Sequence, residues 1–149
     1  MGRQSERPTD AKFWDRHPEL RIDDGILEEG ILQATNVRIR AVAPEREKVG
    51  VTVLCRRGGC YSGCNVEGRF RDKVTAEQAA LAAAVSSGEH QKDPKFVRAI
   101  VIAAEDLWPI PELVQEYCDD CLIVLVDPDL NIRLISSLSE ECARSISTD

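Results

Sequence analysis

Two almost uninterrupted apolar runs, at residues 96–104 and 122–126, constrain the fold of this chain more than any other feature. A strand with one face in water alternates apolar and polar residues, whereas a strand covered on both faces is apolar nearly throughout. Both runs are far shorter than the roughly 20 residues that a membrane-spanning helix needs. They therefore predict buried strands in a sheet with helices on both faces.

The segments around these runs complete an α/β pattern. Apolar residues at helical spacing predict a helix over residues 26–41. Two β-branched runs at 49–55 and 60–66, separated by Arg56-Arg57-Gly58-Gly59, are typical of an antiparallel hairpin. Residues 75–85 are rich in alanine and open on a Thr-x-x-Gln capping box, which predicts the clearest helix of the chain.

The rest of the chain extends this order. We expect a short helix over residues 109–117, a strand over 132–135 and a helical segment around 138–144. A chain of 149 residues with 43% hydrophobic content is long enough for one packed core. The predicted fold is a three-layer α/β/α sandwich with a mixed five-stranded sheet.

The N-terminal residues differ in character. Residues 1–24 are charged and aperiodic, so we predict a flexible or peripheral arm that Phe13 and Trp14 could pin, followed by one domain at 25–149. The start of the chain has no signal-peptide pattern, which indicates a cytoplasmic protein without membrane contact. The net charge of −7 argues against a long nucleic acid as partner, because binding to polyphosphate relies on Lys and Arg.

Residues 37–139, about two thirds of the chain, resemble the cytidine deaminase family in the order of several motifs. The segment at 63–67 is similar to the family's Gly-Cys-Asn-Val-Glu-Asn motif, and residues 75–77 stand where Cys-Ala-Glu belongs. Pro109 opens a helix where the family has Pro-Cys-x-x-Cys. The matching segments, in chain order, are Ala43-Pro44 with Val49-Gly50-Val51, Gly63-Cys64-Asn65-Val66-Glu67, Thr75-Ala76-Glu77 and Pro109.

The resemblance breaks at the residues that would hold the family's catalytic zinc. Three thiolate or imidazole side chains hold that ion at the starts of two facing helices, and the zinc-bound water attacks C4 of cytosine. Here the three positions are Thr75, Ile110 and Leu113. Aliphatic side chains cannot coordinate a metal, and a Thr hydroxyl is a weak ligand. We therefore expect the fold without a metal or any other cofactor.

Other family residues remain. Asn65 and Glu67 match the residues that hydrogen-bond the ribose hydroxyls, although both also suit a turn at a strand end. Glu77 matches the proton shuttle, although a Glu in the first turn of a capped helix is also an ordinary dipole partner. Arg69 and Arg71 lie in a basic loop that is either solvated or able to bind a phosphate or carboxylate.

The chain's cysteines are interpreted as thiols, because a cytosolic protein rarely carries disulfides. Cys118 and Cys121 have the C-x-x-C spacing of a zinc knuckle or redox pair, but they follow the predicted helix, away from the helix starts, and ordinary buried or surface thiols are the favoured interpretation. His17 and His90 lie where neither has a partner suited to metal binding or catalysis. The six cysteines are Cys55, Cys60, Cys64, Cys118, Cys121 and Cys142.

These observations lead to three hypotheses of function. The first is a pseudoenzyme that binds a nucleoside, a nucleotide or a protein partner through the old pocket or through the oligomer surface. The second is a metal-free enzyme that uses Glu77 as acid or base on a nucleoside-like substrate, and the third is residual zinc-dependent deamination. The resemblance also implies a homo-oligomer, either a dimer or a tetramer, in which neighbours complete each other's pockets.

Overall fold

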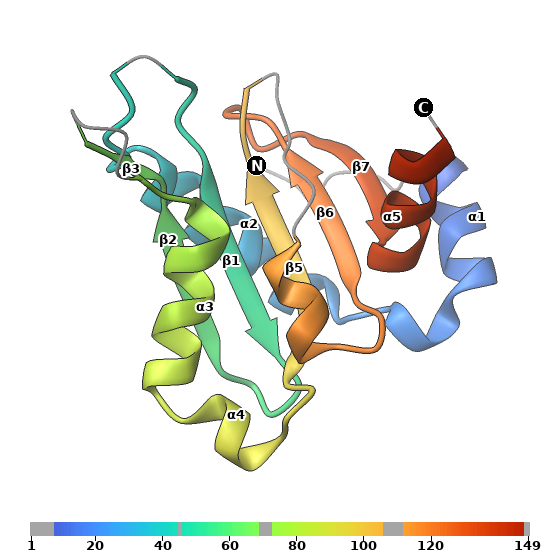
Figure 1. Ribbon diagram of the computed structural model, residues 1–149. Helices are drawn as coiled ribbons and strands as arrows, with labels where there is room; N and C mark the ends of the chain where they lie inside the picture. The colour runs from blue at the N-terminus through green and yellow to red at the C-terminus, as the bar shows by residue number, and fades with distance from the viewer. Residues whose placement is uncertain (1–7, 45, 69–72, 106–111, 148–149) are drawn as a thin grey trace.

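The computed structural model describes residues 8–44, 46–68, 73–105 and 112–147 (Figure 1). At its centre is a five-stranded sheet with the strand order β2-β1-β5-β6-β7. Within this sheet β5 and β6 are parallel, whereas the other neighbouring strands are antiparallel. The predicted mixed α/β sheet is therefore confirmed. Its strands are β1 Gly50–Cys55, β2 Cys60–Cys64, β5 Val97–Ala103, β6 Leu122–Val126 and β7 Ile132–Ser137.

Helices cover both faces of this sheet. The helix α3 and the 3₁₀ helix η2 lie on one face, and α2 lies on the other (Figure 1). A separate two-stranded hairpin joins β3 Val66–Glu67 to β4 Lys73–Val74. The helices are α1 Pro8–Arg16, η1 Pro18–Leu20, α2 Asp24–Arg38, α3 Ala76–Ser86, α4 Glu89–Lys92, η2 Leu113–Tyr117 and α5 Leu138–Ser147.

The central strands are apolar throughout because each face has its own core. On β5, Ile100 and Ile102 pack into the cluster beneath α3, whereas Ala99 and Val101 pack into the cluster beneath α2. All four side chains are almost completely buried. The alternation of side chains along a strand thus divides one apolar run between two cores.

Two glycines let helices approach the sheet closely. A Cβ atom at Gly63 on β2 would overlap the backbone of α3 at Ala79 and Ala80. A Cβ atom at Gly50 on β1 would likewise overlap the backbone of α2 at Ala34. These two glycines belong to the motifs that carry the family resemblance, and their structural role is to bring both helix layers onto the strands.

Several predicted boundaries are corrected. The helix predicted over residues 26–41 ends at Arg38. The strand predicted over residues 60–66 ends at Cys64, because the Asn65 side chain accepts the backbone N–H of Val49 at 2.8 Å and turns the chain toward β3. The helix predicted over residues 109–117 is a 3₁₀ helix in its described part, and its expected start lies outside the described residues. The sequence predicted neither α4 nor the β3–β4 hairpin.

The N-terminal segment packs against the sheet through its aromatic residues. Phe13 and Trp14 are 1% and 8% exposed, and they share a core cluster with Ile31 of α2 and Val124 of β6. No helix was predicted here, because α1 is short and its stability depends on this packing more than on helix propensity. The division of the chain at residues 24 and 25 stays a prediction.

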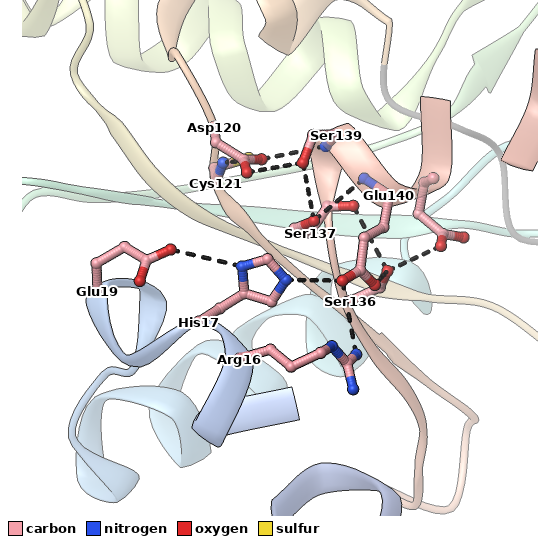
Figure 2. Close-up of polar contacts among 10 residues, drawn as sticks. Arg16, His17, Glu19, Asp120, Cys121, Ser136, Ser137, Ser139 and Glu140 are labelled. Atoms are coloured by element: carbon pink, nitrogen blue, oxygen red, sulfur yellow. Dashed lines mark hydrogen bonds and ion pairs between the residues drawn. The ribbon is translucent and has the colours of Figure 1, made fainter. Parts of the chain in front are cut away.

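A polar cluster joins this segment to the C-terminal helix (Figure 2). His17 Nε2 lies 2.7 Å from Glu140 Oε1, and Arg16 forms an ion pair with the same oxygen at 3.5 Å. On the other side of the cluster, the buried Ser136 hydroxyl donates to Glu141 at 2.8 Å. The end of α1 is therefore held against the start of α5 by polar and charged groups, while the aromatic pair holds α1 on α2 and β6.

The described helices include none that is both long enough and apolar enough to cross a lipid bilayer.

The pKa of Glu140 generates a prediction about stability. Burial alone would raise this pKa, but the hydrogen bond from His17 and the charge of Arg16 outweigh burial and hold it below its ordinary value. The ionised carboxylate therefore stabilises the fold above the pKa of the unfolded chain, and this stability is lost as pH falls through the lower folded pKa. Glu140→Gln should cost about 0.5–1 kcal/mol near neutral pH, because the ion pairs are partly exposed and screened.

Urea unfolding over a series of pH values measures this difference. The difference between parent and Glu140→Gln should shrink toward zero in acid. Asp15→Asn is the matched control, because Asp15 is exposed on α1, and it should leave the free energy of unfolding nearly unchanged. A loss in Glu140→Gln that is equal at every pH would contradict the proposed role of ionisation.

Candidate functional site

A cavity of about 570 Å³ lies on the face of the sheet covered by α3 and η2. Its apolar wall comes from Val51 of β1 and Ile102 of β5, which are register partners, and from Leu113 of η2. The start of α3 and the β3–β4 hairpin complete its rim. A cavity with an apolar wall and polar groups at its rim is the usual form of a small-molecule site.

Thr75 stands at the N-terminus of α3, and its side chain is already engaged. The Thr75 hydroxyl accepts the backbone N–H of Gln78 at 3.1 Å, and the Gln78 side chain accepts the backbone N–H of Thr75 at 2.9 Å. This reciprocal pair is the predicted capping box. The first of the three zinc-ligand positions thus serves as a helix cap.

Glu77 links α3 to η2 across the cavity wall. Its carboxylate accepts the backbone N–H of Val114 at 2.9 Å, at the start of η2. Burial raises the pKa of Glu77, although hydrogen bonds from the backbone of residues 112–114 partly offset this effect. The carboxylate that matches the family's proton shuttle therefore also caps a neighbouring helix, and Val114 itself is completely buried.

The donor atoms around the cavity are oxygens and nitrogens of Asn, Gln, Thr, Glu, Lys and Arg. Within the described residues, the cavity lining contains neither cysteine nor histidine, and no three His, Cys, Asp or Glu side chains form a group able to hold a metal ion. All six cysteines and both histidines belong to the described part of the chain. Leu113 lies in the cavity with 38% of its surface exposed, whereas Ile110 lies outside the described residues. This donor set does not fit zinc, which takes thiolate and imidazole ligands.

The structure brings Asn65 and Glu67 together at the rim. The Asn65 amide oxygen accepts the Val49 N–H, and its Nδ2 donates to the Glu47 carbonyl at 3.0 Å and to Glu67 Oε2 at 3.4 Å. Glu67 Oε1 forms an ion pair with Arg46 at 3.2 Å. Much of the hydrogen-bonding capacity of Asn65 thus holds residues 47–49 in place, and Glu67 is the member of the pair with more capacity for a ligand.

The predicted basic loop is only partly described. Arg69 and Arg71 lie outside the described residues, whereas Lys73 is exposed on β4 and lines the cavity. Sequence reasoning missed three carboxylates that also line it, namely Glu47, Glu112 and Glu116. The spacing of Glu112 and Glu116, four residues apart on a predicted helix, was the available signal, since such residues share a helix face.

Cys118 and Cys121 lie in the core under α3 and do not line the cavity. Both are buried. The thiol of Cys118, directly after η2, donates to the carbonyl of Val114 at 3.4 Å. The described cysteines form no disulfide. The ordinary interpretation as buried thiols agrees with this packing.

Solved structures with the same arrangement are cytidine deaminases. The protein from Burkholderia pseudomallei has a TM-score of 0.64 and 26% identity over 80% of this chain and 95% of its own. The protein from Mycobacterium tuberculosis has a TM-score of 0.57 and 22% identity over 81% and 94%. The protein from Mycobacterium leprae has a TM-score of 0.59 and 18% identity over 77% and 95%.

The chain has a cytidine deaminase-like fold. No protein-family model and no curated protein sequence matches it. The similarity of three-dimensional structure therefore confirms the predicted fold. Because the sequence identities are low, the chemistry of the site has to be argued from the residues of this chain.

The hydrogen bond from the Val114 N–H to Glu77 leads to a prediction. It separates the capping role of the Glu77 side chain from the effect of its charge. Glu77→Ala leaves a buried N–H without a partner and should destabilise the protein by about 1–3 kcal/mol. Glu77→Gln keeps an acceptor oxygen. Because the folded pKa of Glu77 is raised, its contribution to stability is lost as pH rises through that pKa, and Gln removes this loss.

Urea unfolding at neutral pH provides the test. Glu77→Gln should be at least as stable as the parent, while Glu77→Ala should be clearly less stable. Equal stability of the Ala variant and the parent would show that the bond to Val114 contributes nothing.

Proposed function

We propose that this chain is a zinc-free pseudoenzyme of the cytidine deaminase-like fold that binds a nucleoside or nucleotide in the 570 Å³ cavity. The observation that carries this proposal is the bond between Glu77 and the Val114 N–H. A proton shuttle must work on a metal-bound water, and here the same carboxylate is held by the tip of the facing helix.

The side chains at the three ligand positions support the absence of zinc chemistry. The Thr75 oxygen already accepts a hydrogen bond in its capping box, and Leu113 and Ile110 have no donor atom. Zinc affinity comes from deprotonated sulfur and neutral imidazole ligands, and no such side chain lines the described cavity. Residual deamination through zinc is therefore the least supported of the hypotheses.

The chemistry of the cavity favours a ligand that is partly apolar and rich in hydroxyl groups. Val51, Ile102 and Leu113 offer an apolar wall for a flat ring. At the rim, the Glu67 carboxylate offers acceptor oxygens, as a sugar diol requires. Lys73, with Arg69 and Arg71 in the same basic loop, supports the extension from a nucleoside to a nucleotide.

A second function is favoured by the raised pKa of Glu77. A half-buried carboxyl that borders a cavity and holds its proton more tightly than usual is suited to acid or base catalysis. In this alternative the chain is a metal-free enzyme that acts on a nucleoside-like substrate. Binding of a protein partner through the same cavity is a further form of the pseudoenzyme proposal.

Three broader statements remain proposals. We infer a homo-oligomer, as a dimer or tetramer, and a cytoplasmic location from the resemblance and the sequence. We also propose that residues 1–24 act as an arm attached to one domain at residues 25–149.

Thermal unfolding with added nucleosides and nucleotides, with zinc measured on the same sample, tests the proposed function. A ligand such as cytidine or its monophosphate should raise the unfolding midpoint of the parent. Glu67→Gln should abolish this rise, because it removes a negatively charged acceptor at the rim. Glu28→Gln is the matched control, because Glu28 is exposed on α2 on the other face of the sheet, and it should keep the rise.

The outcomes separate the hypotheses. The pseudoenzyme proposal expects zinc far below one ion per chain, no conversion of cytidine to uridine, and binding that survives Glu77→Gln. Metal-free turnover that disappears in a folded Glu77→Gln variant supports the second function instead. One zinc per chain together with deamination would overturn the proposal.

A further inference from the structure

A second, smaller cavity of about 180 Å³ lies between the N-terminal segment and the sheet. Arg56, directly after β1, and Arg98 on β5 line it, together with Glu19, Leu20 and Asp120. The two arginines flank the register pair of Cys55 and Val97, at a point where the β1–β5 ladder is irregular, and both side chains reach the same cavity. The first cavity lies at the opposite end of β1, near Val51.

Most guanidinium N–H groups of the two arginines have no hydrogen-bond acceptor among the described residues. The half-buried Arg98 donates through Nη2 to the backbone carbonyl of Arg21 at 3.2 Å, and this oxygen carries no formal charge. Among the described residues, Arg56 has no ion pair and no side-chain hydrogen bond. Each guanidinium carries five N–H donors in a planar fork. Most of these donors are thus available to a ligand.

The two carboxylates in the wall are engaged elsewhere (Figure 2). Asp120 accepts the backbone N–H of Cys121 at 2.9 Å and both the N–H and the hydroxyl of Ser139, at 3.1 and 2.8 Å. Glu19 pairs with the His17 ring at 3.5 Å. These contacts hold the acidic groups against their own partners, and within the described ranges no carboxylate forms an ion pair with either arginine of the cavity.

We propose that this second cavity binds a phosphate group, either as inorganic phosphate or as the end of a phosphomonoester. Two guanidinium forks close together match the oxygens of phosphate and form charge-assisted hydrogen bonds with them. The bound anion joins β1 to β5 and, through the bond from Arg98 to Arg21, supports the segment that follows η1. This site is separate from the cavity of the proposed function and does not depend on it.

Thermal unfolding with inorganic phosphate, at ionic strength kept constant with sodium chloride, tests the proposal. The midpoint should rise by about 3–5 °C when phosphate reaches about ten times its Kd. Arg56→Gln should reduce this rise to nearly nothing. This variant should fold like the parent, because Arg56 is exposed and makes no ion pair among the described residues. Arg57→Gln is the matched control, because Arg57 is the next residue, is exposed and does not line the cavity.

Two further measurements sharpen the result. Glu67→Gln should keep the full response to phosphate, which separates this site from the first cavity. If methyl phosphate binds as tightly as inorganic phosphate, the ligand is assigned as a phosphomonoester. If the protein responds to inorganic phosphate alone, the ligand is assigned as the free ion. No midpoint shift in the parent, or an equal shift in parent and Arg56→Gln, would overturn the proposal.

Discussion

The burial of β5 and β6 on both faces is the constraint on which the rest of the structure depends. Each strand supplies side chains to two cores, so a helix layer has to lie close against either face. Close approach is possible because Gly50 and Gly63 leave room for the backbones of α2 and α3. The first turn of α3 is thereby fixed over the sheet, and with it the positions of Thr75 and Glu77. The cavity is a consequence of this packing.

The starts of α3 and η2 face each other on the same side of the sheet. In this chain the Glu77 carboxylate connects them through the Val114 N–H. One hydrogen bond contributes about 1 kcal/mol net. The junction consequently relies on the buried side chains around it, among them Val114 and the Cys118 thiol that bonds to its carbonyl.

Local patterns predicted the elements whose sequence signal lies within a few residues, whereas long-range contacts decided the others. The Thr75 capping box and the apolar run of β5 can be recognised within a few residues, and both were predicted. Phe13 and Trp14 form a buried face of α1 only because α2 and β6 cover them. No pattern within residues 1–24 predicts this packing. The same applies to the candidate site. The closeness of Asn65 and Glu67 follows from their spacing, but only the fold shows that Asn65 bonds to residues 47–49.

The two cavities occupy opposite ends of one antiparallel strand pair, and their walls differ in charge. Val51 and Ile102 mark one end, and Arg56 and Arg98 mark the other, about 17 Å away along β1 at 3.4 Å per residue. The described lining of the first cavity has more carboxylates than cationic groups, which suits hydroxyl groups. The lining of the second has two arginines against two carboxylates that bond to other residues, which leaves the guanidinium groups for an oxyanion. A chain with net charge −7 does not attract polyanions over its whole surface, but two arginines that form no ion pair in the described part of the chain can bind one small oxyanion. The two proposed binding sites are thus separated by the length of a buried strand.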